Sequence, residues 1–405
     1  INNESYFELE TIEIIGSNSM KDYSSTNQPW NTIMSKIKTV KLGSEITTIG
    51  NYAFISATGL QTITWNSIIT TIGSHSFEGC SSLLSLSLPS TVTEVKSYGF
   101  NGCSNMKEIT LSNIQIIGEK AFASTNITTI IIPSTINQID NEAFGNCLQL
   151  SSMTYPNKEI TFSPTMLQGC SSMRTISISG SNAMVNYAKG NQPWTSVKEY
   201  VTTINLNNAI TSVGNYAFAD MTALKTMIWE GVTTISEYSF SGCTGFTSMT
   251  IPNKVISMGT HVFEKCSGIT SISFGTGLTS VSTYAFSECK KLTTVDLKTV
   301  TTIDSYAFAS CSILKTITIP TDITTINSNA FKDSGLTKVI FNGDDEPSEC
   351  DDEGFSGITG LKHVEVLITY SSSDFCKLIP RTEDKCGTTS SECTFTYYHN
   401  NNSLM

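Results

Sequence analysis

Twelve cysteines carry the main potential of this chain for redox or metal chemistry, and eight of them share one repeated position. Each of the eight follows an aromatic or leucine residue by three positions, as Cys80 follows Phe77 and Cys103 follows Phe100. The remaining members of this set, which we call the slot cysteines, are Cys147, Cys170, Cys243, Cys266, Cys289 and Cys311. A set of this size could form a disulfide framework, bind metal as a row of thiolates, or remain as inert thiols.

Spacing favours inert thiols. Equivalent residues of stacked parallel strands lie about 4.8 Å apart, with their Cβ atoms pointing the same way. A disulfide requires Cβ atoms that converge to roughly 3.5–4.5 Å, and zinc requires four ligands in a tetrahedron. A straight row of parallel side chains meets neither condition. We therefore expect the slot cysteines to be small core hydrophobes, and we expect no metal or other cofactor.

The other four cysteines lie outside this position, in an irregular C-terminal segment: Cys350, Cys376, Cys386 and Cys393. An even number in such a segment predicts two disulfides that close the end of the molecule, with four reduced thiols as the alternative.

Histidines and carboxylates give no convergent catalytic set. The four histidines are scattered along the chain, and neither a nucleophile elbow nor a phosphate-binding loop nor a His-Glu-x-x-His motif is present. The segment 344–353 holds seven carboxylates, which could bind calcium but lack the spacing of an EF-hand loop. We interpret this segment as a solvated charge run and the protein as a non-enzyme.

The element that positions all these residues is a repeat with the pattern Leu-x-x-Ile-x-Ile. It returns every 22 to 24 residues, beginning at Leu9 and ending at Leu361, in sixteen registers. Alternation of apolar and polar residues predicts a half-buried strand in each register. A fixed period of this length predicts a solenoid, in which each coil buries its apolar face against its neighbours.

A bulky residue follows each strand at a second fixed position and should reach the core from the opposite side of the coil. We predict core Phe side chains at this position, among them Phe77, Phe100, Phe240, Phe286 and Phe308.

A longer duplication overlies the repeat, because residues 11–54 and 175–218 align without a gap at an offset of 164. Both copies open with a variant coil that ends in Asn-Gln-Pro-Trp, at Trp30 and Trp194. An aromatic ligand pocket is one interpretation of this corner, but we favour the one in which Trp replaces the core Phe. We predict two tandem modules, 1–172 and 173–370, and an irregular cysteine-containing tail, 371–405.

Composition and net charge limit the classes of partner that the protein can bind. Charged residues make up 15% and the net charge is -11, so the clustered Lys and Arg that nucleic-acid binding needs are missing. The sequence contains no run of 18 apolar residues, so it predicts no membrane span. An acidic surface fits a soluble or surface-exposed protein. The chain begins at Ile1 without Met, as a processed or trimmed fragment does, so signal or anchor segments could lie outside it.

The coil from Ile303 through Ala307-Phe308 and Cys311 to Pro320 resembles the leucine-rich repeats of BspA-like surface proteins. The Gly-Ser-Asn-x-Met opening also resembles their N-terminal cap, and the resemblance covers roughly residues 9–370. It implies a leucine-rich-repeat solenoid of the α/β-type class, mostly β, with an irregular or 3-10 convex side. The expected form is curved and right-handed, with about sixteen parallel strands. The asparagine of the Leu-x-x-Asn-x-Leu type is absent. The resemblance further implies a secreted or cell-surface protein that adheres to host cells or to matrix proteins such as fibronectin.

The outward positions of the strands are the candidate binding face. They are mostly Thr and Ser, which argues against pyranose stacking and favours recognition of a protein over a broad polar surface. Charged residues interrupt the hydroxyl array and exclude the regular grid of an ice-binding solenoid. We select Lys107, Glu108, Arg174, Lys225, Lys315 and Lys338 as binding residues. The alternative function is a structural spacer that projects another domain from the cell surface. No oligomeric state follows from the sequence.

Overall fold

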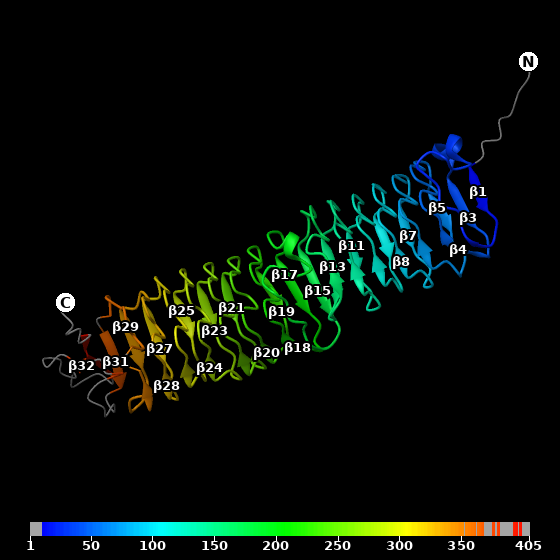
Figure 1. The fold of residues 1–405 in the computed structure, drawn as a ribbon. Coiled ribbons are helices and arrows are strands. Elements are labelled where there is room, and N and C mark those ends of the chain that lie inside the picture. The colour runs from blue at the N-terminus through cyan, green and yellow to red at the C-terminus, as the bar shows by residue number, and fades with distance from the viewer. Residues whose placement is uncertain are drawn as a thin grey trace, which may run out of the picture. The chain divides into compact units, whose positions relative to one another are not determined.

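The computed structural model of the 405-residue chain describes residues 10–351, 353–361, 363–367, 375–376, 379–380, 392–395 and 397–398. These residues divide into two compact units. Unit 1 comprises Ile1–Gly180 and Asn191–Asn205, and unit 2 comprises Ser181–Gly190 and Leu206–Met405. Each unit is a stack of coils (Figure 1).

Every coil contributes one strand to a series that we call the long strands. In unit 1 these are β1 (Thr11–Ile14), β3 (Thr39–Leu42), β5 (Thr62–Thr64), β7 (Ser85–Ser87), β9 (Glu108–Thr110), β11 (Thr129–Ile131), β13 (Ser152–Pro156) and β15 (Thr175–Ser179). β17 (Thr203–Leu206) begins in unit 1 and ends at the first residue of the second part of unit 2. In unit 2 they are β19 (Thr226–Ile228), β21 (Ser248–Thr250), β23 (Ser271–Ser273), β25 (Thr294–Asp296), β27 (Thr316–Ile319), β29 (Lys338–Phe341) and β31 (His363–Leu367).

The described residues therefore hold sixteen long strands, the odd-numbered strands from β1 to β31, one for each sequence register. Pairing is parallel and joins equivalent positions of consecutive coils, as Leu86 pairs with Ile109. This confirms the predicted solenoid of parallel strands and its strand number.

A second series of short strands, mostly two residues long, was not predicted as strands. In unit 1 it comprises β2 (Asn18–Ser19), β4 (Ile46–Ile49), β6 (Thr71–Ile72), β8 (Glu94–Val95), β10 (Ile116–Ile117), β12 (Gln138–Ile139) and β14 (Thr161–Phe162) in one seven-stranded sheet. In unit 2 it comprises β16 (Asn182–Ala183), β18 (Ile210–Val213), β20 (Thr234–Ile235), β22 (Ser257–Met258), β24 (Ser280–Val281), β26 (Thr302–Ile303), β28 (Thr325–Ile326) and β30 (Glu349–Cys350). The short strands form a second set of parallel sheets, one of seven strands in unit 1 and two of four strands in unit 2.

The third side of each coil is a turn rather than a helix. The 3-10 helices of the described residues, η1 (Asn31–Lys36) and η2 (Thr195–Val197), lie in the two variant coils. β32 (Ile379–Pro380), β33 (Glu392–Phe395) and β34 (Tyr397–Tyr398) follow the last coil, and β33 pairs antiparallel with β31. In the described part of the chain, no helix has the length and hydropathy that crossing a bilayer requires.

The core of each unit is a column of stacked Phe rings. In unit 1 the column runs from Trp30 through Phe54, Phe77, Phe100 and Phe122 to Phe144, with centroids 5.1 to 5.7 Å apart. In unit 2 it runs from Phe218 through Phe240, Phe263, Phe286, Phe308 and Phe331 to Phe355. These Phe rings are no more than 1% exposed, and so is Trp194, whose ring contacts Tyr155 edge-on.

Candidate binding surfaces

The outward side chains of the long strands form the surface that we call the strand face. Of the six selected residues, Lys107, Glu108, Arg174, Lys225 and Lys315 are exposed, and Lys338 is half-buried. The first three belong to unit 1 and the last three to unit 2, so the structure does not gather them into one cluster. Within unit 2, Thr316 and Lys338 are register partners, which places Lys315 and Lys338 on neighbouring coils.

The cations of the strand face differ in how far they are already engaged. The Lys338 ammonium forms an ion pair with Glu365 at 2.5 Å. The Arg174 guanidinium donates to the carbonyl oxygens of Ser171 and Met173. Lys107, Lys225 and Lys315 form no ion pair among the described residues, and they are the charges most available to a partner.

Hydroxyl groups at the starts of the long strands bond to the preceding coil. The Thr270 hydroxyl donates to the Thr247 carbonyl at 2.8 Å, and the Thr293 hydroxyl donates to the Thr270 carbonyl at 2.9 Å. Ser151, Thr202 and Thr337 repeat this bond on other long strands. Since the hydroxyl proton points at the preceding coil, the oxygen offers its two lone pairs to solvent. These hydroxyls therefore act toward a partner as acceptors.

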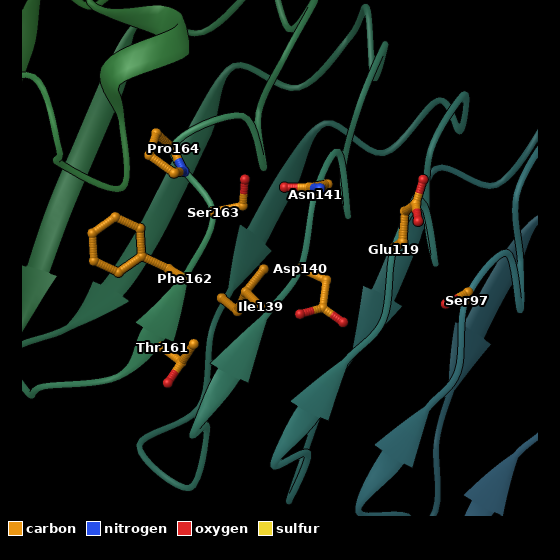
Figure 2. Close-up of a pocket in the computed structure, with 9 residues that line it drawn as sticks. All are labelled: Ser97, Glu119, Ile139, Asp140, Asn141, Thr161, Phe162, Ser163 and Pro164. Atoms are coloured by element: carbon orange, nitrogen blue, oxygen red, sulfur yellow. The ribbon is translucent and has the colours of Figure 1, made fainter.

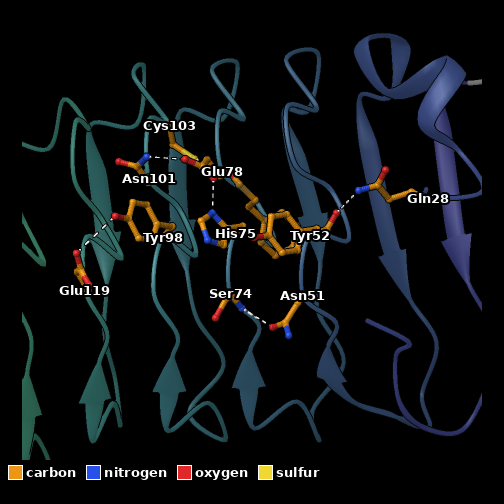
Figure 3. A network of polar contacts seen from close by, with 11 residues as sticks. Gln28, Asn51, Tyr52, Ser74, His75, Glu78, Tyr98, Asn101, Cys103 and Glu119 are labelled. Carbon is orange, nitrogen blue, oxygen red and sulfur yellow. Dashed lines mark hydrogen bonds and ion pairs between the residues drawn. The ribbon is translucent and has the colours of Figure 1, made fainter. Parts of the chain in front are cut away.

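The opposite side of the coils carries a row of stacked rings that we call the turn ladder. In unit 1 it consists of Tyr52, His75 and Tyr98, with centroids 4.6 Å apart (Figure 3). His75 Nδ1 contacts Glu78 at 2.5 Å, and the Asn101 amide donates to the other oxygen of Glu78. Lys120 lies 5.7 Å from the centroid of the Tyr98 ring. Ring faces are covered by their neighbours, so the ladder presents ring edges to solvent.

Unit 2 has a longer turn ladder of five rings, with centroids 4.4 to 4.7 Å apart: Tyr216, Tyr238, His261, Tyr284 and Tyr306. Burial and the neighbouring Tyr216 and Glu264 raise the pKa of Tyr238, while a hydrogen bond to Glu264 raises the pKa of Lys265. All five side chains are half-buried. Neither ladder was predicted from the sequence, although a Tyr two residues before the core Phe recurs at six coils.

The backbone explains why these rings align. Ladder residues have positive φ, for example 58° at Tyr52 and 57° at Tyr284. In this conformation the turn directs its N–H groups along the stack, and Tyr52, Phe54 and Ser56 donate to carbonyls of the next coil. Non-glycine residues rarely adopt positive φ, so the ring stacking and this ladder of bonds must offset the strain.

The slot cysteines are all buried and form no disulfide. Each thiol lies 3.0 to 3.4 Å from the carbonyl oxygen of the core Phe in the preceding coil, to which it donates. Burial raises the pKa of Cys311 to about 12 and raises the pKa of Cys243, Cys266 and Cys289 as well. These four thiols therefore stay protonated, and a protonated thiol is a poor nucleophile and a poor metal ligand. Hydrogen bonds with Cys170 and Thr125 instead lower the pKa of Cys147.

Near the C-terminus, the structure joins Cys350 and Cys376 in a disulfide. Cys386 and most of the predicted tail lie outside the described residues, as does the side chain of Cys393. The acidic segment is engaged in hydrogen bonds: Glu346 accepts from the Cys376 N–H, Glu353 from Asn329 and Asp351 from the Glu353 N–H. Among the described residues, no group of three or more His, Cys, Asp or Glu side chains has the geometry of a metal site.

Short coils with one long strand, one short strand and one Phe–Cys turn define a leucine-rich-repeat protein. The chain belongs to the BspA-type leucine-rich-repeat family, whose model, the BspA type leucine rich repeat region with six copies, matches residues 32–149, 110–190, 196–298 and 233–362.

One solved structure with a TM-score above 0.5 agrees with this fold, and two others are similar to the chain in sequence. A leucine-rich repeat protein from Bacteroides ovatus is 24% identical, with 80% of this chain and 86% of that chain covered and a TM-score of 0.52. A leucine-rich repeat protein from Eubacterium ventriosum is 22% identical, with 82% and 92% covered and a TM-score of 0.33. A leucine rich cell surface protein from Faecalibacterium prausnitzii is 19% identical, with 88% and 87% covered and a TM-score of 0.29. No curated protein sequence matches the chain.

Proposed function

We propose that the protein is a non-enzymatic binding protein, secreted or held at the cell surface, which adheres to host cells or matrix proteins through the strand face. The observation that carries this proposal is the strand face itself. It repeats across the long strands of each unit, its side chains are largely polar and exposed, and its backbone is already paired. Membership of the BspA-type family supports the same function.

Strand-face chemistry also indicates what the partner must offer. Hydroxyl oxygens act as acceptors there, and Lys107, Lys225 and Lys315 supply unpaired positive charge. A partner surface with hydrogen-bond donors and scattered carboxylates is complementary to both. Such contacts are individually weak, so adhesion would depend on many coils at once.

A binding screen of the 405-residue chain against matrix proteins and host cells tests the proposal. We expect saturable binding that falls at least about tenfold when Lys107, Lys225 and Lys315 are all replaced by Glu. The matched control replaces Lys36, Lys189 and Lys254 by Glu, since these are also exposed but neither belong to a long strand nor directly precede one.

Equal loss in the two triple variants would show a net-charge effect and no strand-face site. Absence of saturable binding to any partner would favour the second function, a spacer that only projects another domain.

A further inference from the structure

Unit 1 contains a recess of about 450 Å3 at the corner where the short strands run into the turns (Figure 2). Its lining residues come from the ends of β8, β10, β12 and β14. The polar side is formed by Ser97, Glu119, Asp140 and Asn141, and Ile139 and Pro164 are among the apolar residues. The recess lies outside the strand face, so it is a separate surface from the one proposed above.

Two carboxylates line the recess, and none of its described lining residues is a Lys or Arg. Asp140 Oδ1 accepts a hydrogen bond from Gln138 at 2.8 Å, while Asp140 Oδ2 has no partner among the described residues. Glu119 accepts one long bond of 3.5 Å from the Tyr98 hydroxyl. The neighbouring cation, Lys120, lies 3.7 Å from Glu142. Negative charge in the recess therefore has little internal compensation.

Unit 2 shows the same corner in a closed form, 164 residues further along the chain. Asp304 is the equivalent of Asp140, since 304 − 140 = 164. Both of its carboxylate oxygens accept bonds from adjacent coils, one from Asn327 at 2.9 Å and one from Ser280 at 3.2 Å.

The two donors that close this corner are missing from unit 1. At the same offset of 164, Asn327 corresponds to Ser163 and Ser280 corresponds to Ile116. Ser163 is shorter than Asn, and its hydroxyl lies 2.9 Å from Thr165 instead of reaching Asp140. Ile116 has no donor. The recess therefore lies where unit 1 lacks both donors, and other lining positions differ as well, since Glu119 corresponds to Thr283 and Asn141 to Ser305 at this offset.

We propose that this recess binds an arginine side chain from a basic segment of a partner protein. The guanidinium group has five N–H donors and a fixed positive charge, which match Asp140, Glu119 and the Asn141 amide oxygen. Its aliphatic stem can lie on Ile139 and Pro164. A neutral sugar would leave both carboxylate charges uncompensated, which makes it the poorer occupant.

Fluorescence polarisation with a fluorescein-labelled hexapeptide of alternating Arg and Gly, at physiological salt, tests this site on the full chain. Ser163→Asn introduces one of the two donors that bind the equivalent carboxylate in unit 2, and Asp140→Asn removes the charge of Asp140. We expect each substitution to weaken peptide binding at least about tenfold, the value of one charge-assisted contact. Asp304→Asn is the matched control and should change it less than about twofold.

A citrulline–Gly peptide of the same length separates charge from shape, and we expect it not to bind. The proposal is wrong if wild type does not bind the Arg peptide or if the citrulline peptide binds equally well. It is also wrong if Asp304→Asn weakens binding as much as Asp140→Asn, because general acidity would then explain the result. Thermal melting of Ser163→Asn must match wild type within about 2 °C, and Ile116→Ser, which restores the other donor, provides a second closing variant.

Discussion

The strand face and the turn ladder are built from the same repeat, yet their side chains differ in role. Those of the turn ladder hold neighbouring coils together, and those of the strand face are exposed to solvent. On the strand face, backbone bonds between register partners such as Ile272 and Val295 hold the coils together, and the outward side chains are left exposed. On the turn side, the rings of Tyr284 and its neighbours stack on each other, and the thiol of Cys266 bonds the Phe240 carbonyl. Side chains that already hold the fold cannot vary freely, whereas those of the strand face can.

This difference indicates where recognition can evolve. A substitution on the strand face alters a surface, but one in the core or turn alters a contact that joins neighbouring coils. Four predictions test this contrast, and the expected effect decreases from the first to the last.

Substitution of a core Phe should lower the stability of the protein most. Phe240→Ala removes a ring that is fully buried between Phe218 and Phe263. We expect the unfolding free energy to fall by about 3–5 kcal/mol. Urea unfolding, monitored by hydrogen exchange of the adjacent coils, measures this loss. A loss below about 1 kcal/mol would show that the Phe position does not carry the core.

The second largest effect should come from alkaline pH, which deprotonates the thiols that donate to the Phe carbonyls. Because the folded chain raises the pKa of Cys311 to about 12, it keeps a proton that the unfolded chain releases above about pH 9. Stability from this thiol is complete below pH 9 and falls by about 1.4 kcal/mol per pH unit up to about pH 12.

Cys311→Ala provides the comparison for that titration. It should be less stable than wild type at pH 7, but its stability should decline less steeply between pH 9 and 12. Parallel pH profiles of the two proteins would contradict the prediction.

Turn residues should show an unusual order of substitutions. Tyr284→Ala loses ring stacking but keeps a strained positive φ of 57°, whereas Tyr284→Gly loses the stacking and relieves the strain. We expect Gly to be more stable than Ala by about 1 kcal/mol, the reverse of the order in regular structure. Urea midpoints of the two variants measure this order, and Tyr284→Phe, which keeps the ring, should resemble wild type.

The strand face should be the most tolerant. Thr270→Val removes an exposed hydroxyl that donates to the Thr247 carbonyl but keeps a β-branched side chain. We expect a change of about 0.5 kcal/mol or less in unfolding free energy. A loss of more than about 1.5 kcal/mol would show that the hydroxyl ladder holds the fold and is not free to vary.

Apolar periodicity predicted most of the fold because burial follows it directly. Leu83, Leu86 and Leu88 alternate with polar residues, and all three are buried in the coil that contains β7. The short strands were missed because a two-residue strand such as β8 has too few residues for alternation to be visible. Its pairing follows from the stacking of coils and not from local pattern.

The turn ladder and the recess were missed for a different reason. Tyr52 and His75 have unlike side chains, and the feature they share is a positive φ. A positive φ cannot be predicted from the residue type unless that residue is Gly. In the recess, the decisive positions are Ser163 and Ile116, and their importance follows only from the bonds that Asn327 and Ser280 form with Asp304 in unit 2. The selected strand-face residues remain a prediction, since no bound partner marks them.

The direction of the turn bonds gives unit 2 an electrostatic polarity. Tyr238, Phe240 and Gly242 each donate an N–H to a carbonyl of the following coil, and the later coils repeat this direction up to Asn329 and Phe331. Peptide dipoles that point the same way add, so this column has a macrodipole with its positive end toward the C-terminus, as a helix has toward its N-terminus. Glu353 lies at that end, where its side chain accepts a hydrogen bond from Asn329 and its negative charge is stabilised.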